Sequence, residues 1–213
     1  MAEDKALYEA ILSGDAEAAQ VAAVKALAAG AQPMDLITHA MIPAMDEVGR
    51  LFESEEYYFP ELLMSGQAMK AAMVPLRPLL AAAGHKSAGT IIAGTVQGDL
   101  HDIGKNLVVS MLEGAGFEVF DLGTDVPPAQ FVEAIRKYHP QIVCLSALLT
   151  VTMPTMKTTI EALSAAGVRD QVKVLIGGAP INQRYAQEIG ADGYGETANS
   201  AVVLARKLTG KVA

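Results

Sequence analysis

The second part of the chain alternates short apolar runs with helical segments, and this alternation restricts the fold more than any other feature of the sequence. Each run is rich in β-branched or apolar residues, has the length of a strand and is followed by a segment with helical periodicity. Five such pairs in succession predict a parallel, doubly wound sheet with helices on both faces. The predicted strands lie at residues 90–96, 117–123, 141–147, 172–178 and 191–195, and the predicted helices at residues 103–115, 128–138, 153–166, 182–189 and 197–208.

The first part of the chain has a different pattern, which is typical of helices. Residues 5–83 are rich in Ala, Leu, Met and Glu, and apolar positions recur at intervals of three and four without strand-like alternation. Asp15 and Asp35 are expected to cap helix starts, and Pro60 is expected in a first helical turn. The breaks that divide this part into a small four-helix bundle fall at residues 13–15, 30–33 and 52–61.

The change of pattern marks a domain boundary. The chain has 213 residues, 51% of them hydrophobic, which is enough for one ordinary domain and a smaller partner. The polar, glycine-containing segment 84–89 separates the two patterns and is the expected linker. We therefore expect a helical domain at residues 1–85 and an α/β domain at residues 86–213.

The composition disfavours several classes of protein. A formal net charge of −8, with 16 scattered Lys and Arg residues, is unlike the concentrated basic surface of a nucleic-acid-binding protein. The single cysteine, Cys144, excludes internal disulfides and multi-cysteine metal sites, and it lies in an apolar run as a buried side chain would. The chain begins without a signal-peptide pattern, and no apolar stretch reaches the roughly 20 residues needed to cross a bilayer. We expect a cytoplasmic protein that binds neither nucleic acid nor membrane.

The segment GDLHDIG, which follows the first predicted strand, carries the most unusual chemistry. In a doubly wound sheet, ligands bind beyond the carboxyl ends of the strands, and His101 falls at such an end. A histidine that ligates a metal usually donates its second ring N–H to a carboxylate, and Asp99 can supply that group. The alternative is a loop histidine that is solvated or bonded to a backbone carbonyl.

A single histidine cannot form a catalytic zinc site, which typically uses three protein ligands. None of the other histidines, His39, His85 and His139, falls at the carboxyl end of a predicted strand. His101 can instead be the one axial ligand of a metal whose other positions are filled by a macrocycle, as in haem and corrinoid proteins.

Small residues at the ends of predicted strands leave room for a bulky cofactor. Gly98 and Gly104 flank the histidine. Ser146 lies near the end of one predicted strand, and Gly177 with Gly178 ends another. A tight turn is the alternative explanation for the adjacent glycines. The loop lacks the G-x-G-x-x-G order of a dinucleotide site, and the chain contains no phosphate-binding P-loop sequence.

The pattern D-x-H-x-x-G of Asp99, His101 and Gly104, followed by an S-x-L and a glycine pair at fitting intervals, resembles the cobalamin-binding motif of methionine synthase and of the small corrinoid proteins of methyltransferase systems. Residues 48–72, VGRLFESEEYYFPELLMSGQAMKAA, resemble the helical cap domain of those proteins. The resemblance covers nearly the whole chain. It implies an N-terminal four-helix cap bundle followed by a Rossmann-like (flavodoxin-like) five-stranded parallel doubly wound sheet.

The resemblance also implies roles for individual residues. His101 would be the lower axial ligand of cobalt, replacing the dimethylbenzimidazole base of cobalamin, and Asp99 would hydrogen-bond its imidazole. Thr152 stands where methionine synthase has a serine that bonds the aspartate, so the hydroxyl is retained although the residue differs. Phe52 and Phe59 of the cap would shield the upper face of the corrin, with a plain core role as the alternative for both. The other implied cofactor-binding residues are Gly98, Leu100, Asp102, Ile103 and Gly104 in the same loop as the histidine, and Ser146, Leu148, Thr150, Gly177, Gly178, Gly193 and Tyr194 along the nucleotide tail.

The function implied by the resemblance is that of a methyl carrier, a subunit of a methyltransferase system that is not itself a complete enzyme. Cobalt would cycle between Co(I), which accepts a methyl group, and a methyl-Co(III) form, as in methylcobalamin, which gives it up. The implied partners are a substrate-specific methyltransferase, an acceptor methyltransferase of the tetrahydrofolate or coenzyme M type, and a reductive activator. Proton uptake by the pair of His101 and Asp99 would accompany methyl loss, and the cap would swing aside about a hinge at residues 81–89.

The sequence leaves three alternatives open. An isomerase-type cobalamin domain shares D-x-H-x-x-G, but the helical cap disfavours it. A cobalamin-dependent sensor uses the same cap and sheet, usually beside a DNA-binding module. A flavodoxin-like protein without a metal would leave His101 incidental. The identity of the methyl donor is not encoded in any of these motifs.

Overall fold

The computed structural model describes residues 2–82 and 87–210, and the chain divides into two compact units. The first, here called the helical unit, comprises the chain up to Ser87 together with the short segment Glu113–Gly116. The second, the sheet unit, comprises Ala88–Leu112 and the chain from Phe117 onward. Residues 83–86 lie outside the described residues, so the predicted linker at 84–89, the hinge and the domain boundary after residue 85 stay predictions.

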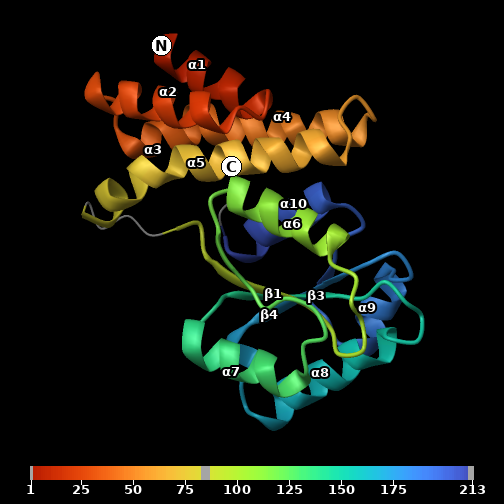
Figure 1. The fold of residues 1–213 in the computed structure, drawn as a ribbon. Helices are drawn as coiled ribbons and strands as arrows, with labels where there is room; N and C mark the ends of the chain where they lie inside the picture. Colours follow the sequence, from red (N-terminus) through yellow and green to blue (C-terminus); the bar gives the residue numbers. More distant parts are fainter. Residues whose placement is uncertain (1, 83–86, 211–213) are drawn as a thin grey trace. The chain divides into compact units, whose positions relative to one another are not determined.

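The helical unit contains four helical rods, as the sequence pattern predicts (Figure 1). Its third rod is composite, because α3, the π-helical turn η1 and α4 follow one another without a break. Asp15 caps α2 as predicted, with its side chain accepting a hydrogen bond from the Ala18 amide at 2.9 Å, and Pro60 lies in the first turn of α5. The bounds are α1 Ala2–Leu12, α2 Ala16–Ala28, α3 Pro33–Leu36, η1 Ile37–Met41, α4 Ile42–Glu53 and α5 Phe59–Ala82.

Asp35 does not cap a helix, so this prediction is wrong. Asp35 lies inside α3, and the N-cap position is occupied by Gln32, which has extended backbone and no side-chain hydrogen bond to the helix. Pro33 begins the helix instead. A proline suits this position because its φ is already helical and it has no N–H that would need a cap.

The turn between α1 and α2 packs tightly on α5. Gly14 has a φ of 74°, and a Cβ at this residue would lie 2.6 Å from the Cβ of Met64. The hydroxyls of Tyr57 and Ser65 donate hydrogen bonds to the Leu12 carbonyl at the end of α1, at 3.1 and 3.2 Å. These contacts satisfy a carbonyl that has no partner within its own helix.

The sheet unit contains a five-stranded, all-parallel sheet in the order β2-β1-β3-β4-β5, which confirms the predicted fold class. This is the strand order of flavodoxin-like proteins. Figure 1 shows α6 and α10 on one face of the sheet and α7 and α8 on the other. The bounds are β1 Thr90–Thr95, α6 Ile103–Gly114, β2 Glu118–Asp121, α7 Pro128–Tyr138, β3 Ile142–Ser146, α8 Met153–Ala165, the 3₁₀ helix η2 Arg169–Gln171, β4 Lys173–Gly177, α9 Gln183–Ile189, β5 Gly193–Tyr194 and α10 Ala198–Leu208.

The core of the sheet unit lies mainly between the strands and α7, α8 and α9. Val143 and Val174 from the central strands pack there with the fully buried Phe131 of α7. Burial raises the pKa of the Cys144 thiol in β3 to about 12, so this side chain remains a neutral thiol within the sheet. None of the described helices combines the length and the apolar composition needed to cross a membrane.

Candidate functional site

The loops after β1 and β3 leave the sheet at the point where the strand order reverses. The loop after β1, residues 96–102, is here called the histidine loop, and the loop after β3 comprises residues 147–152. From β1 the chain passes to β2 on one side, and from β2 it crosses back to β3 on the other side. Open parallel sheets bind ligands in the crevice that forms beyond the strand ends at such a point.

The side chain of Asp99 connects these two loops. It is fully buried. Its Oδ1 accepts hydrogen bonds from Nδ1 of His101 at 2.9 Å and from the backbone amide of the same residue at 3.0 Å. Its Oδ2 accepts hydrogen bonds from the Thr152 hydroxyl at 2.7 Å and from the Leu148 amide at 2.8 Å. The predicted residues Asp99, His101 and Thr152 therefore form one hydrogen-bonded group.

The donors around Asp99 keep its carboxyl ionised. Burial by itself raises the pKa of this carboxyl, because the charged form loses its hydration. The hydrogen bonds from Thr152, Leu148 and His101 outweigh that effect and hold the pKa well below its usual value. Asp99 is therefore a buried carboxylate at neutral pH.

An ionised Asp99 determines which nitrogen of His101 is free. Nδ1 must carry a hydrogen in order to donate to the carboxylate, so a neutral imidazole has its lone pair on Nε2. The His101 side chain is 51% exposed, whereas its partner is fully buried. The ring is thus held from the protein side while Nε2 is available as a metal ligand.

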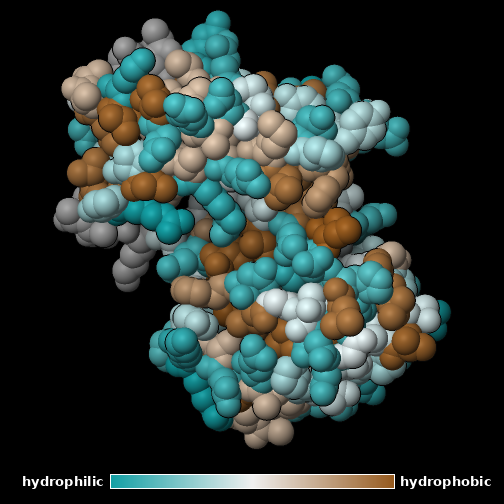
Figure 2. Space-filling view, viewed as in Figure 1, coloured by the Kyte–Doolittle hydropathy of each residue, from teal (hydrophilic) through white to brown (hydrophobic). Residues whose placement is uncertain are grey.

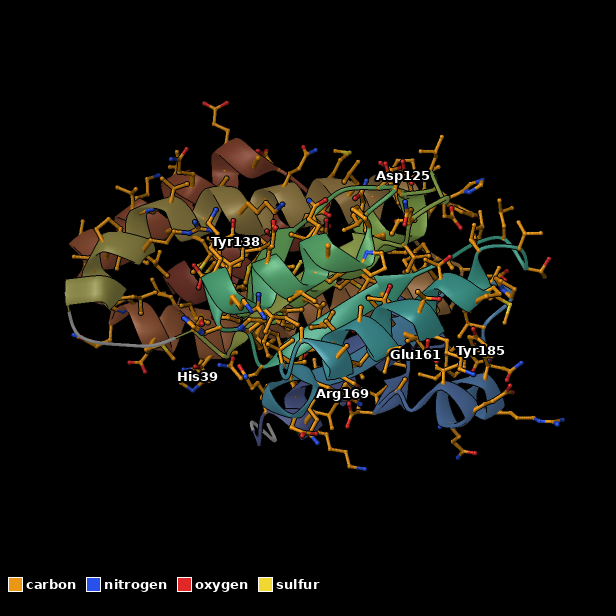
Figure 3. All side chains as sticks on the ribbon, turned by 90° about the horizontal axis from the view of Figure 1, so that it is seen from below. His39, Asp125, Tyr138, Glu161, Arg169 and Tyr185 are labelled. Carbon is orange, nitrogen blue, oxygen red and sulfur yellow. The ribbon has the colours of Figure 1, made fainter. Side chains whose placement is uncertain are left out.

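Asp125, which no motif identified, also contacts the histidine loop. Its Oδ1 accepts a hydrogen bond from the Gly98 amide at 2.7 Å, and its own amide donates to the Asp99 carbonyl at 3.0 Å. Figure 3 shows Asp125, which precedes α7, well separated from Tyr138, the last residue of that helix. In the sequence, Asp125 follows a predicted strand and is closely followed by two prolines, a pattern that indicates a turn. The pattern does not show which residue the carboxylate would bind.

Two glycines leave open space beside His101. A Cβ at Gly104 would meet nothing within 4 Å, and one at Gly98 would meet only the Thr152 Cγ2 at 3.7 Å. Gly98 also has a φ of 86°, in the left-handed region that favours glycine. No side chain therefore fills the space beside the histidine at these two positions.

The glycine pair at the end of β4 is explained by close packing against neighbouring backbone and not by open space. A Cβ at Gly178, where φ is 130°, would overlap the Ala147 carbonyl oxygen, and one at Gly177 would lie 3.2 Å from the Gly195 carbonyl oxygen. Close packing of backbone segments thus requires glycine at position 178 and favours a small residue at position 177. A role for the pair along a nucleotide tail stays a prediction.

Large apolar side chains are exposed around the histidine. Two are in or next to the histidine loop and three are in the loop after β3, and Val203 is the one other large apolar residue described as exposed in the sheet unit. Figure 2 shows apolar side chains gathered on the side of this unit where Figure 1 places the starts of α6 and α8. An exposed apolar surface of this kind is typical of a binding site. The five residues are Leu100, Ile103, Leu148, Leu149 and Val151.

Other predicted cofactor-binding residues surround this group or lie farther along the strand ends. Asp102 accepts a hydrogen bond from the Asn106 side chain at 3.1 Å. Ser146 is the last residue of β3, and Thr150 is exposed in the loop that follows. Gly193 and Tyr194 form the short strand β5.

Phe52 and Phe59 belong to the helical unit. Phe52 lies in the last turn of α4, and Phe59 is the first residue of α5. Both side chains are half-buried. Their proposed place above a corrin stays a prediction.

Two family models match the chain, and each is described as a B12 binding domain. One matches residues 89–203, in the sheet unit, and the other matches residues 4–76, in the helical unit. The trimethylamine corrinoid protein of Methanosarcina barkeri is 46% identical over 196 residues, which cover 91% of this chain and 90% of that protein.

Two solved structures match over nearly the whole chain. A cobalamin-binding protein from Desulfitobacterium hafniense DCB-2 matches with a TM-score of 0.79 and 37% identity, covering 96% of this chain and 98% of that chain. A chain from the methanol:cobalamin methyltransferase complex of Methanosarcina barkeri matches with a TM-score of 0.87 and 30% identity, covering 99% of this chain and 81% of that chain.

Fold, site geometry and matches together define a corrinoid-binding protein. The chain belongs to the family of corrinoid proteins of methyltransferase systems, and its cofactor is a corrinoid. The residues at the switch point fit this cofactor, because His101 has a free Nε2, Asp99 fixes its ring, and Gly98 and Gly104 leave space for a flat macrocycle.

Proposed function

We propose that this chain carries methyl groups between two methyltransferases on the cobalt of a corrinoid, with His101 as the lower axial ligand. The observation that carries the proposal is the hydrogen bond from Nδ1 of His101 to the fully buried Asp99, which leaves Nε2 for a metal. The bound corrinoid supplies a cobalt ion that can accept and release a methyl group. The residues of the chain ligate and orient this cofactor and manage protons around it.

His101 would replace the cofactor's own base, in the base-off, His-on arrangement. The hydrogen bond to the negatively charged Asp99 on the opposite side of the ring makes the imidazole a stronger electron donor to a metal and fixes its direction. The exposed side chains of Leu100, Ile103 and Leu148 would lose their contact with water when a macrocycle covers them, which favours binding. The nucleotide tail would extend past Thr150 toward the end of β4.

The Thr152 hydroxyl can form a hydrogen bond with Asp99 whether or not the carboxyl is protonated. This hydroxyl lies 2.7 Å from Oδ2 of Asp99 and 2.9 Å from the Leu149 carbonyl oxygen, and its single hydrogen can serve one of them at a time. When Oδ2 is protonated, it can donate to the Thr152 oxygen, which can then donate to the Leu149 carbonyl. The hydrogen bond between Thr152 and Asp99 can therefore persist in both protonation states of the carboxyl without leaving an unsatisfied group.

The helical unit would cover the other side of the cofactor. Phe52 and Phe59 are the side chains that would shield it, and residues 81–89 would form the hinge that lets the unit move aside for a partner protein. The partners are a donor methyltransferase, an acceptor methyltransferase and a reductive activator. A trimethylamine corrinoid protein and a chain of a methanol methyltransferase complex are among the similar proteins, so methylated amines and methanol are the first donors to test.

A methyl-transfer assay tests this function. The cobalamin-loaded protein is combined with a donor methyltransferase for methanol or a methylamine and with an acceptor methyltransferase for coenzyme M or tetrahydrofolate. We expect methyl transfer with one donor class, and His101→Ala should abolish it while the fold, measured by circular dichroism, is kept. A loaded wild-type protein that transfers no methyl group with any of these systems would contradict the proposal.

A further inference from the structure

We propose that Asp125, in the loop between β2 and α7, is a positioning residue that holds the histidine loop in the conformation from which His101 ligates cobalt. This inference rests on the proposed function, because it assigns to Asp125 an effect on that ligation. Asp125 lies outside the D-x-H-x-x-G pattern and comes from a different strand end.

Asp125 holds two adjacent residues of the histidine loop at once. Its carboxylate accepts the Gly98 amide at 2.7 Å, and its backbone amide donates to the Asp99 carbonyl at 3.0 Å. Two hydrogen bonds on consecutive residues fix both the position of this segment and its rotation. Asp99 in turn holds the ring and the backbone amide of His101 through one carboxylate oxygen.

Besides Asp125, the histidine loop is held by the Asp99 amide, which donates to the Val96 carbonyl at 3.1 Å, and by the Thr95 hydroxyl, which donates to the His101 carbonyl at 2.9 Å. Neither of these bonds is made by Gly98 itself. Glycine has more backbone freedom than any other residue, and a φ of 86° is easily changed in the absence of a Cβ. The Thr152 Cγ2, at 3.7 Å, is all that a Cβ at Gly98 would meet within 4 Å. The Asp125 carboxylate is the acceptor that the Gly98 amide uses.

Asp125 is itself held firmly against β1. The next residue, Val126, is buried, donates to the Thr95 carbonyl at 3.0 Å and forms a parallel bridge with Val96. Asp125 has a φ of 53°, in the left-handed region where aspartate and asparagine are enriched among residues other than glycine. The carboxylate is thus presented to the histidine loop from a rigid base.

Two variants separate the effect of the Asp125 carboxylate from the effect of its left-handed backbone conformation. Asp125→Gly keeps the left-handed conformation without strain but removes the acceptor. Asp125→Asn also tolerates that conformation and keeps one oxygen that can accept the Gly98 amide. Asp192→Asn is the matched control, because the Asp192 carboxylate likewise accepts a backbone amide, that of Val174 at 2.8 Å, but does so at the opposite edge of the sheet.

The main measurement is electron paramagnetic resonance of the cobalt(II) form of the loaded full-length protein, grown with nitrogen-15 histidine. The signal gives the ratio of His-ligated to unligated cobalt. We expect Asp125→Gly to lower this ratio by about tenfold, the effect of losing one hydrogen bond to a charged group. Asp125→Asn should restore most of the ratio, and Asp192→Asn should leave it at the wild-type value.

Amide exchange measured by NMR without any cofactor gives an independent reading. Exchange of the Gly98 amide should be faster in Asp125→Gly by about tenfold, and close to wild type in Asp125→Asn. A wild-type ratio in Asp125→Gly, or an equal loss in Asp192→Asn, would overturn the inference. If the wild-type protein itself shows no histidine nitrogen on cobalt, the proposed function fails and the inference with it, so the two failures are distinct.

Discussion

The Asp99 carboxylate is surrounded by hydrogen-bond donors, so a change that keeps its shape but removes its charge should be informative. Asp99→Asn places an amide NH₂ toward the donors from Leu148 and Thr152 or toward His101, and one favourable contact becomes a repulsion. We expect cobalamin affinity, measured by spectroscopic titration, to fall by about 10- to 100-fold. Asp192→Asn is the control, because that carboxylate also accepts a backbone amide, that of Val174, but lies at the opposite edge of the sheet and should change affinity little.

The contact between Asp99 and His101 also leads to a prediction about proton uptake during methyl transfer. When the bond from His101 to cobalt loosens, the freed Nε2 has a lone pair that can accept a proton from solution, and the buried negative charge of Asp99 stabilises the charged ring. We expect proton uptake when the methyl group is removed and the histidine bond loosens, measured with a pH indicator in weak buffer. Equal proton balance in the wild type and in Asp99→Asn would show that this pair does not take up the proton.

Gly178 should be among the residues of the sheet unit least tolerant of substitution. Gly178→Ala combines a φ of 130° with overlap between the new Cβ and the Ala147 carbonyl, and we expect the free energy of unfolding to fall by about 2–4 kcal/mol in urea denaturation. Gly190→Ala is the control, since its φ of 75° is also positive but its Cβ would meet nothing within 4 Å. A loss of about 1 kcal/mol is expected there. Equal losses in the two variants would contradict the packing argument.

At the scale of elements, the carboxylate of Asp192, the residue before β5, links β5 to β4 at a place away from the site. Its contribution to stability should depend on pH. Burial alone raises the pKa of Asp192, but the hydrogen bonds from the Val174 amide and from Arg169, at 2.8 and 2.7 Å, lower it below its usual value. A carboxyl with a lowered pKa stabilises the fold above its unfolded-state pKa of about 4, and this contribution is lost as the pH falls below that value.

Asp192→Asn should therefore lower the free energy of unfolding by about 1–2 kcal/mol at pH 7. The difference from the wild type should shrink as the pH is lowered from about 5 to about 3, because the wild-type carboxyl then gains a proton. Urea denaturation at a series of pH values measures both effects. A difference that stays constant across this range would mean that the charge of Asp192 does not stabilise these strands.

The alternation of apolar runs and helical segments predicted every strand and α-helix described in the sheet unit to within two residues at each end, but not the short 3₁₀ helix η2. It succeeded because buried parallel strands need apolar runs and each crossover helix needs an amphipathic pattern. The π-helical turn η1 was not predicted. There the Ile42 amide bonds to the Ile37 carbonyl, five residues back, directly before Pro43, whose missing N–H interrupts the normal helical ladder.

The candidate site was predictable only in part. The spacing of Asp99 and His101 within one loop is local, so the sequence pattern leads directly to their contact. Thr152 was identified only through the family resemblance, because 53 positions separate it from Asp99 and no local pattern links the two residues. Asp125 was missed, since its bond to Gly98 depends on a left-handed turn in another loop, and periodicity carries no information on such a turn.

At the scale of the whole molecule, the division into two units predicts a localised effect of the cofactor. A ligand that binds the folded sheet unit stabilises that unit by mass action. At free cobalamin of about 100 times its dissociation constant, amides in β1 and β3 that exchange through unfolding of the unit should slow by about 100-fold. His101→Ala should remove most of this effect at the same concentration. Unchanged exchange in both strands on addition of cobalamin would contradict cofactor binding at their carboxyl ends.

The central claim is that the imidazole of His101 occupies the lower position of the cobalt. Electron paramagnetic resonance of the cobalt(II) protein, prepared once with natural histidine and once with nitrogen-15 histidine, tests it most directly. We predict that the isotope replaces the nitrogen-14 splitting of the cobalt lines by that of nitrogen-15, and that His101→Ala abolishes this change. A splitting that is identical in the two preparations would show that no histidine of the protein holds the metal.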